Sequence, residues 1–163
     1  MVPRAAQTLT IAALLWTGIL LAAPEAIAHQ TFAIPATGIY AASSAICHQR
    51  AERSFHLSGM PLPVCARCLG LYLSGAVGAL VAWGFRPRLL DRARTILGLA
   101  AAPTALSWGA EVVGLAAFSN LARAMASLPL GLVAGWLFVQ LLRYDSHVNG
   151  DEIHDGRPRA GIG

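Results

Sequence analysis

The three cysteines of the chain lie close together, beside residues that could act with them. Cys47 is followed directly by His48, and Cys65 and Cys68 form a Cys-x-x-Cys pair. Two thiolates at this spacing converge on one ion, and Cys47 with His48 or His56 could complete a Cys₃His set for zinc, or for iron. The first hypothesis is therefore a metal site made of Cys47, His48, Cys65 and Cys68.

The same thiols could instead perform thiol–disulfide exchange. A helix beginning near Leu69 would place Cys65 and Cys68 at its N-terminal end, where the helix dipole and Arg67 both stabilise a thiolate. Cys47 would then be the partner or resolving thiol. A third alternative is a structural disulfide between two of the thiols, which leaves one cysteine over. The ligand count favours the metal site, although adjacent residues seldom both bind one ion and a second Cys-x-x-Cys pair is absent.

The composition indicates an integral membrane protein. The 163 residues are 56% hydrophobic and only 12% charged, which lies outside the usual range of soluble domains. The basic residues are all arginine and cluster beside apolar runs, a pattern that indicates membrane orientation rather than nucleic-acid binding. The sequence contains no catalytic triad pattern, phosphate loop or dinucleotide fingerprint, so it supports no hydrolase, kinase or nicotinamide enzyme.

The apolar runs predict an all-α fold, a polytopic membrane protein with a four-helix transmembrane bundle in one domain of residues 1–142. The runs are long enough to cross about 30 Å of hydrocarbon, and the predicted spans cover residues 5–23, 69–85, 95–118 and 124–142. An extracytoplasmic segment over 24–68 carries the cysteines between the first and second spans. It is expected to include a short interfacial helix over 35–46. Residues 143–163 are predicted to form a disordered cytoplasmic tail.

Small residues recur at intervals of four on two predicted spans. They are Gly70, Ser74, Gly78 and Ala82 on the second span, and Gly131 and Gly135 on the fourth. Such stripes allow helix backbones to approach closely. They favour packing within the bundle and leave open a helix-packing protein partner or a homo-oligomer, in addition to contact with the lipid bilayer.

The first span is predicted to remain as a signal anchor, because its uncharged run is longer than the core of a signal peptide. The alternative is cleavage after the small residues Ala26 and Ala28. Either alternative places the cysteine segment outside the cytoplasm.

The arginines indicate the orientation. With both termini of the chain in the cytoplasm, eight arginines lie inside and four outside, in accord with the positive-inside rule. The inner set is Arg4, Arg86, Arg88, Arg92, Arg94, Arg143, Arg157 and Arg159, and the outer set is Arg50, Arg53, Arg67 and Arg123. A further span over 26–46 would reverse the later segments and leave five inside against seven outside. The sequence therefore predicts a cell-membrane protein with an extracytoplasmic cysteine site.

An acidic residue, Glu111, lies within the third predicted span. A charge at mid-membrane costs about 2.5–3.5 kcal/mol, so Glu111 is expected to face the bundle interior, on the same helical face as Ser107 and Trp108. It could act beneath the cysteines as a proton acceptor, a ligand or a support for the ligands. Alternatively it could pair with Arg123 or Arg53 and only hold helices together.

Two other polar groups have alternative interpretations. Arg50 and Arg53 could bind an anionic substrate or headgroup, but solvation at the outer interface is favoured. The tail could bind a metal weakly, although a solvated tail is favoured. Its candidate ligands are Asp145, His147, Asp151, Glu152, His154 and Asp155.

Several motifs resemble those of a known family. These are Cys-His-Gln at 47–49, Glu-Arg-Ser-Phe-His at 52–56, Gly59 and Val-Cys-Ala-Arg-Cys-Leu-Gly-Leu-Tyr at 64–72. They closely resemble the predicted membrane proteins of domain-of-unknown-function family number two thousand and eighty-five. A looser match is Ser-Asn-Leu-Ala-Arg at 119–123, which is similar to the family's Thr-Asn-x-x-Arg segment. The resemblance implies a small multi-span protein and no particular activity. The family signature would consist of Cys47, His48, Cys65, Arg67 and Cys68.

Overall fold

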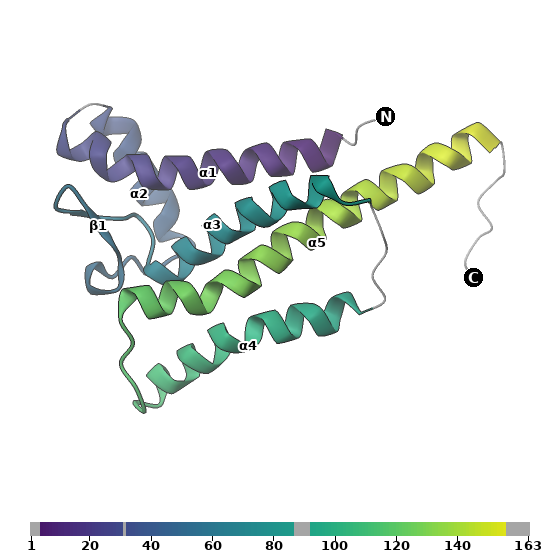
Figure 1. Cartoon of the computed structure of the whole chain (residues 1–163). Coiled ribbons are helices and arrows are strands. Elements are labelled where there is room, and N and C mark those ends of the chain that lie inside the picture. Colours follow the sequence, from purple (N-terminus) through teal and green to yellow (C-terminus); the bar gives the residue numbers. More distant parts are fainter. Residues whose placement is uncertain (1–3, 31, 87–91, 156–163) are drawn as a thin grey trace.

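The computed structural model describes residues 4–30, 32–86 and 92–155, with side chains as far as Ser146. Most of these residues are helical (Figure 1). The helices are α1 (Arg4–Ala28), α2 (Ala33–Ser44), α3 (Ala66–Val81), α4 (Ala93–Val112) and α5 (Asn120–Asp155), with 3₁₀ turns η1 (Ala51–Arg53) and η2 (Ala82–Gly84). A small antiparallel hairpin pairs β1 (His56–Leu57) with β2 (Met60–Pro61).

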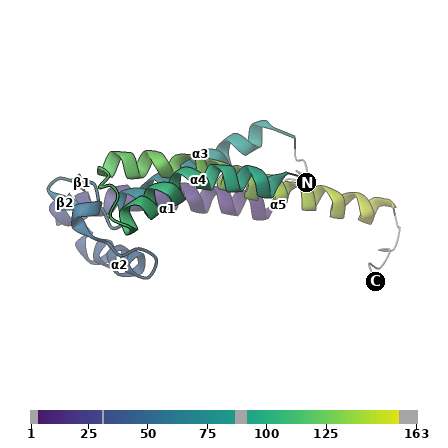
Figure 2. The same cartoon turned by 90° about the horizontal axis from the view of Figure 1, so that it is seen from below.

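The four longer helices lie along one axis (Figures 1 and 2). α3 and α5 run in one direction and α1 and α4 in the other (Figure 1). α2, the hairpin and the loop that follows α2 gather at one end of the bundle, beside the first turns of α3 and α5. We call this the thiol end, because all three cysteines belong to residues 45–68 within it. Both the start of α1 and the last turns of α5 lie at the opposite end.

Within the described part of the chain, three helical segments are long and apolar enough to cross a membrane: Arg4–Ala28, Ala66–Gly84 and Asn120–Ser146. Helices occupy all four predicted positions, but α4 does not qualify as a span by composition. Arg94 and Glu111 both lie within its 20 residues and lower its hydropathy. The structure therefore supports a mostly helical protein with three candidate spans rather than the full four-span prediction.

The C-terminal ends of α4 and α5 differ most from the prediction. α4 ends at Val112 rather than at 118, because Gly114 adopts the left-handed conformation, with φ 75°. The Leu115 N–H then donates to the Ala110 carbonyl at 2.9 Å and the Gly114 N–H to that of Glu111 at 3.2 Å, which closes a Schellman turn.

α5 continues to Asp155, whereas the sequence predicted a disordered tail from residue 143. Continuing a long helix adds hydrogen bonds without a new nucleation cost, so polar residues can be helical there. The described residues do not include Arg157 and Arg159 of the tail, or Arg88 and Asp91 between α3 and α4. The same is true of the side chains of the proposed tail ligands beyond Asp145.

The short helix predicted over 35–46 is present as α2, which begins two residues earlier, at Ala33. α1 is longer than predicted, because it continues through Pro24 to Ala28. Buried residues such as Leu20 pack α1 against the rest of the thiol end. α1 and α2 thus frame the cysteine segment from one side.

α3 and α5 pack with their backbones in close contact, as the small-residue stripes predict. A methyl group added at Gly135 would collide with the backbone of Gly75, and one added at Gly78 would collide with that of Leu132. Near the thiol end, Gly70 is equally close to Ala124. This contact fixes α3 and α5 relative to each other along their length.

Replacing Gly135 with valine is expected to separate α3 from α5 and to lower the melting temperature in detergent. Overpacked sites usually cost about 1–3 kcal/mol, and here the obstacle is backbone that cannot rotate away. Gly18→Val in α1 is the matched control, since no atom of another helix lies within 4 Å of the added methyl group. Equal melting temperatures for the two variants would contradict this account of the packing.

Candidate metal centre

The structure brings the three thiols together. The sulfur atoms of Cys47, Cys65 and Cys68 all lie within 4.8 Å of one another. Cys47 is buried, Cys65 and Cys68 are half-buried, and all three are free thiols. Cys65 caps the N-terminus of α3 and Cys68 lies in its first turn, so the Cys-x-x-Cys pair and Cys47 come from two separate segments.

Local structure places Cys47 beside the pair. The Cys47 N–H donates to the Ser43 carbonyl at 2.9 Å, which attaches the residue to the last turn of α2. Its sulfur accepts a hydrogen bond from the Cys65 N–H at 3.2 Å. Leu20 and Val64, both fully buried, pack against Cys47. The thiols therefore lie at the edge of an apolar cluster.

Gln49 holds together the two segments that carry the thiols. Its Nε2 donates to the Tyr40 carbonyl at 2.6 Å and to the Pro63 carbonyl at 2.8 Å. The residue adopts φ 46°, which turns the chain sharply after Cys47. Gln49 is not among the residues predicted to form the site, although it belongs to the Cys-His-Gln motif. The motif is therefore the feature of the sequence that could have pointed to Gln49.

The environment favours ionisation of one thiol. A hydrogen bond from the Cys68 thiol lowers the pKa of Cys65 to about 5, despite partial burial that opposes this shift. The backbone N–H groups of Arg67 and Cys68 in the first turn of α3 act in the same direction. Cys65 is thus the thiol of the cluster that ionises most readily. Both thiol–disulfide exchange and metal binding need such a thiolate.

The thiols border a cavity of about 420 Å³. Its wall includes His48, Trp108 and four arginines: Arg50, Arg53, Arg67 and Arg123. His48 is exposed and lines the cavity, but its ring lies outside the group formed by the three sulfur atoms. His56, the alternative nitrogen ligand, lies on β1 and is not part of the cavity wall.

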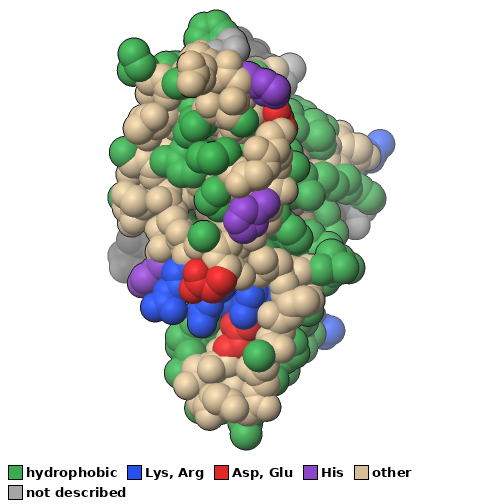
Figure 3. All heavy atoms as spheres, turned by 90° about the vertical axis from the view of Figure 1, so that its left-hand side faces the viewer, with side chains coloured by type: hydrophobic (Ala, Val, Ile, Leu, Met, Phe, Trp, Pro, Cys, Tyr) green, Lys and Arg blue, Asp and Glu red, His purple; other side chains and the backbone are tan. Residues whose placement is uncertain are grey.

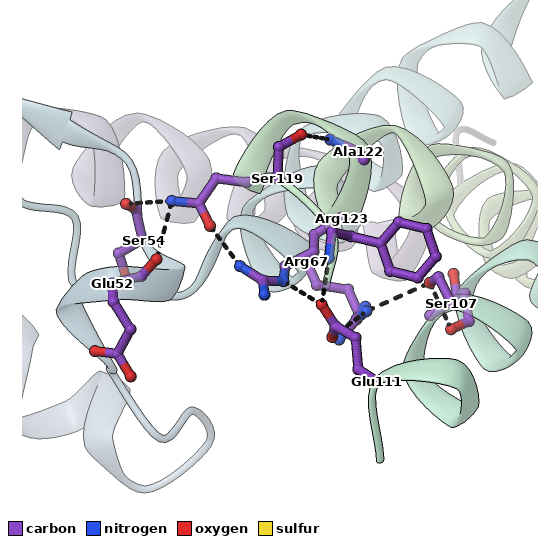
Figure 4. A network of polar contacts seen from close by, with 11 residues as sticks. Glu52, Ser54, Arg67, Ser107, Glu111, Ser119, Ala122 and Arg123 are labelled. Carbon is purple, nitrogen blue, oxygen red and sulfur yellow. Dashed lines mark hydrogen bonds and ion pairs between the residues drawn. The ribbon is translucent and has the colours of Figure 1, made fainter. Parts of the chain in front are cut away.

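A buried carboxylate is shared by two of these arginines (Figure 4). Arg67 Nη2 lies 3.1 Å from one oxygen of Glu111, and Arg123 Nε lies 2.7 Å from the other. The three side chains are only 15%, 13% and 8% exposed for Arg67, Arg123 and Glu111. Glu111 therefore faces the bundle interior. Glu111 pairs with Arg123, one of the two partners predicted from the sequence. Its second partner is Arg67, and not Arg53.

Asn120 extends this network to the thiol segment. Its Oδ1 accepts a hydrogen bond from Arg123 at 2.8 Å, and its Nδ2 donates to the carbonyl of the buried Ser54 at 3.0 Å. Asn120 thereby ties the η1 turn to the start of α5. This contact was not predicted from the sequence, although Asn120 lies in the Ser-Asn-x-x-Arg segment.

Charged side chains gather in one region of the thiol end, as Figure 3 shows for the face at the left of Figure 1. Arg50, Glu52 and Arg53, which belong to the thiol end, are exposed. The thiol end thus carries exposed arginines in addition to the two largely buried ones that contact Glu111.

Glu111→Gln is expected to destabilise the protein strongly, because it leaves two largely buried guanidinium groups without their counter-charge. Removing one partner of a buried ion pair typically costs about 3–5 kcal/mol. Thermal melting in detergent measures the loss. Glu52→Gln is the control, since Glu52 is exposed and its carboxylate makes no ion pair with the described residues. If Glu111→Gln melts at the same temperature as the control, Glu111 does not stabilise the fold through its two arginines.

The chain has relatives among uncharacterised proteins. It is 34% identical over 104 residues to the uncharacterized protein MJ1492 of Methanocaldococcus jannaschii, which covers 62% of this chain and 64% of that protein. An uncharacterized protein of Methanothermobacter thermautotrophicus is 30% identical over 87 residues, or 53% of this chain and 78% of that protein. No solved structure gives a significant match.

A family model described as "Predicted membrane protein (DUF2085)" matches residues 47–137. This range begins at Cys47 and contains the other two thiols, the cavity arginines and Glu111. The match covers more than half of the chain. Together with its apolar helices and its cysteine motifs, it shows that the chain belongs to the DUF2085 family of predicted membrane proteins.

Proposed function

We propose that this membrane protein binds a metal ion, zinc or iron, at the cluster of Cys47, Cys65 and Cys68. The observation that carries the proposal is the mutual distance of the three sulfur atoms, at most 4.8 Å. In a tetrahedral zinc site with Zn–S bonds of about 2.3 Å, the sulfur atoms lie about 3.8 Å apart. Small side-chain rotations would therefore be enough to form the site.

The fourth ligand is proposed to come from the cavity side. His48 lines the same cavity as the thiols, which makes it the candidate among the described residues. It would have to turn toward the sulfur atoms, and its exposure leaves it free to do so. An exogenous ligand in this position would correspond to the open coordination site of catalytic zinc centres.

α4 is proposed to be the fourth membrane crossing. Its 20 residues correspond to about 30 Å of helix, enough for the hydrocarbon core. Polar side chains that lower its hydropathy turn inward: Thr104 donates to the Ala126 carbonyl at 2.9 Å, and Glu111 contacts Arg123. Large side chains on its exposed surface, such as Leu99 and Leu106, are apolar and suit contact with lipid.

The thiol end is proposed to face away from the cytoplasm, with both chain termini inside. Four arginines lie at the thiol end, and the sequence count of eight against four supports this orientation. The described arginines of the opposite end are Arg4, Arg86, Arg92, Arg94 and Arg143.

Thiol–disulfide exchange is the second candidate, and the lowered pKa of Cys65 favours it. A thiolate at the N-terminus of α3 could attack a partner disulfide, with Cys68 or Cys47 close enough to resolve the mixed disulfide. A metal-free protein that forms mixed disulfides would support this candidate.

Elemental analysis of the detergent-purified protein is expected to find about one zinc or iron ion per chain, as a single tetrahedral site requires. Substitution of any one of Cys47, Cys65 or Cys68 by serine should release most of the ion, because each removes a thiolate ligand. His48→Ala should weaken metal affinity by at least about tenfold.

His56→Ala provides the matched control, since His56 is an equally exposed histidine outside the cavity wall. Its metal content should equal that of the wild type. If the wild-type protein contains no metal and only one of its thiols reacts, the metal-site proposal is wrong and the cysteines form a structural disulfide.

Orientation and thiolate identity can be tested together in right-side-out vesicles after chelation. At pH 6, an impermeant thiol reagent is expected to modify Cys65 first, because its pKa of about 5 keeps it ionised where an ordinary thiol is protonated. Peptide mass spectrometry identifies the labelled residue, and Cys65→Ser should remove the rapid phase. If the reagent labels the protein only after permeabilisation, the cysteines face the cytoplasm and the proposed orientation is wrong. If Cys68 is labelled before Cys65, the assignment of Cys65 as the thiolate is wrong.

A further inference from the structure

We infer that the cavity beside the thiols is a binding site for a phosphate group, carried either by a free phosphate compound or by a lipid headgroup. Its wall holds four arginines, Arg50, Arg53, Arg67 and Arg123, and no carboxylate side chain. This inference goes beyond metal binding and does not require a metal.

The positive charge of the cavity wall is not balanced by the carboxylates that contact it, and the exposed Glu52 makes no ion pair with a described arginine. The arginines carry four positive charges, and Glu111, which contacts Arg67 and Arg123 from behind the wall, cancels one. A divalent ion on three thiolates has a net charge of minus one and cancels another. Two positive charges therefore remain even with the proposed metal in place, enough for a dianion such as hydrogen phosphate.

The four arginines form two layers. Arg67 and Arg123 are 15% and 13% exposed, and Glu111 and Asn120 fix their guanidinium groups in position. Arg67 Nε is buried and has no hydrogen-bond partner within the described part of the chain. A bound oxyanion would supply an acceptor for such a donor, whose burial without a partner is costly.

Arg50 and Arg53 form the outer layer. Both are exposed, and within residues 4–30, 32–86 and 92–146 their side chains make no hydrogen bond or ion pair. Arginine at a protein surface without a carboxylate partner is available to a ligand. The planar guanidinium group matches the geometry of phosphate oxygens, which it can contact through two donors at once.

Size and position also favour a phosphate compound. At about 420 Å³ the cavity falls in the range of small-molecule sites rather than of single-ion sites. Trp108, 58% exposed, and Ile46, 55% exposed, add apolar surface to its wall, suited to the carbon part of a phosphate ester. Since Arg67 and Arg123 of the cavity wall lie in the first turns of α3 and α5, a headgroup could reach the cavity directly from the bilayer.

The test uses the full-length protein in nanodiscs of phosphatidylcholine. One arm titrates inorganic phosphate by calorimetry, and the other counts phosphatidylglycerol molecules retained per protein by native mass spectrometry after mixed-lipid reconstitution. Arg50→Gln/Arg53→Gln should weaken binding by about tenfold or more, because each substitution removes a charged hydrogen-bond donor. These residues make no side-chain contacts, so the variant should fold.

Arg86→Gln/Arg92→Gln is the matched control, because it removes two exposed arginines at the opposite end of the bundle. It should bind as the wild type does. Cys65→Ser/Cys68→Ser, which removes the proposed metal site, should also bind, so that loss of metal and loss of anion binding can be told apart.

The arms identify the source of the phosphate. Binding in the calorimetric arm alone supports a soluble phosphate compound, and retention of phosphatidylglycerol alone supports a headgroup. Absence of binding in both arms would overturn the inference. Equal weakening by the control pair would overturn it as well, and loss of binding in the cysteine variant would assign the anion to the metal rather than to the arginines.

Discussion

The arrangement of the thiol end depends on one carboxylate, that of Glu111, held between Arg67 and Arg123. These three residues come from α4, α3 and α5, so a single buried group joins three helices at one point. Arg67 lies between Cys65 and Cys68 in the sequence, which links the thiols to this point directly. A buried charge with two opposite partners is costly to disturb.

The close contact of α3 and α5 makes this geometry possible. Gly70 lies against Ala124 near the thiol end, only a few residues from Arg67 and Arg123. Larger side chains at the contact would move the two helices apart and carry the arginines away from their shared carboxylate. Gln49 and Asn120 complete the arrangement by fastening the loop segments to this helix pair.

The sequence predicted what composition and spacing determine. The helical membrane character, the clustering of Cys47, Cys65 and Cys68, and the inward position of Glu111 all follow from residue type and period. It did not predict the pairing of Glu111 with Arg67, because contacts between helices depend on their relative rotation. The end of α4 was also missed, since the left-handed turn at Gly114 depends on local geometry that hydropathy does not report.

The pairing of Glu111 with Arg123 also bears on how the chain would reach the bilayer. The two residues are twelve positions apart, on either side of the short loop between α4 and α5. α4 on its own would carry a carboxylate into hydrocarbon, an unfavourable step that Arg67 of the preceding helix and Arg123 of the next helix both relieve. In a four-span topology, α4 would therefore meet one of its two counter-charges on a helix that is already made, and the second would follow only with α5.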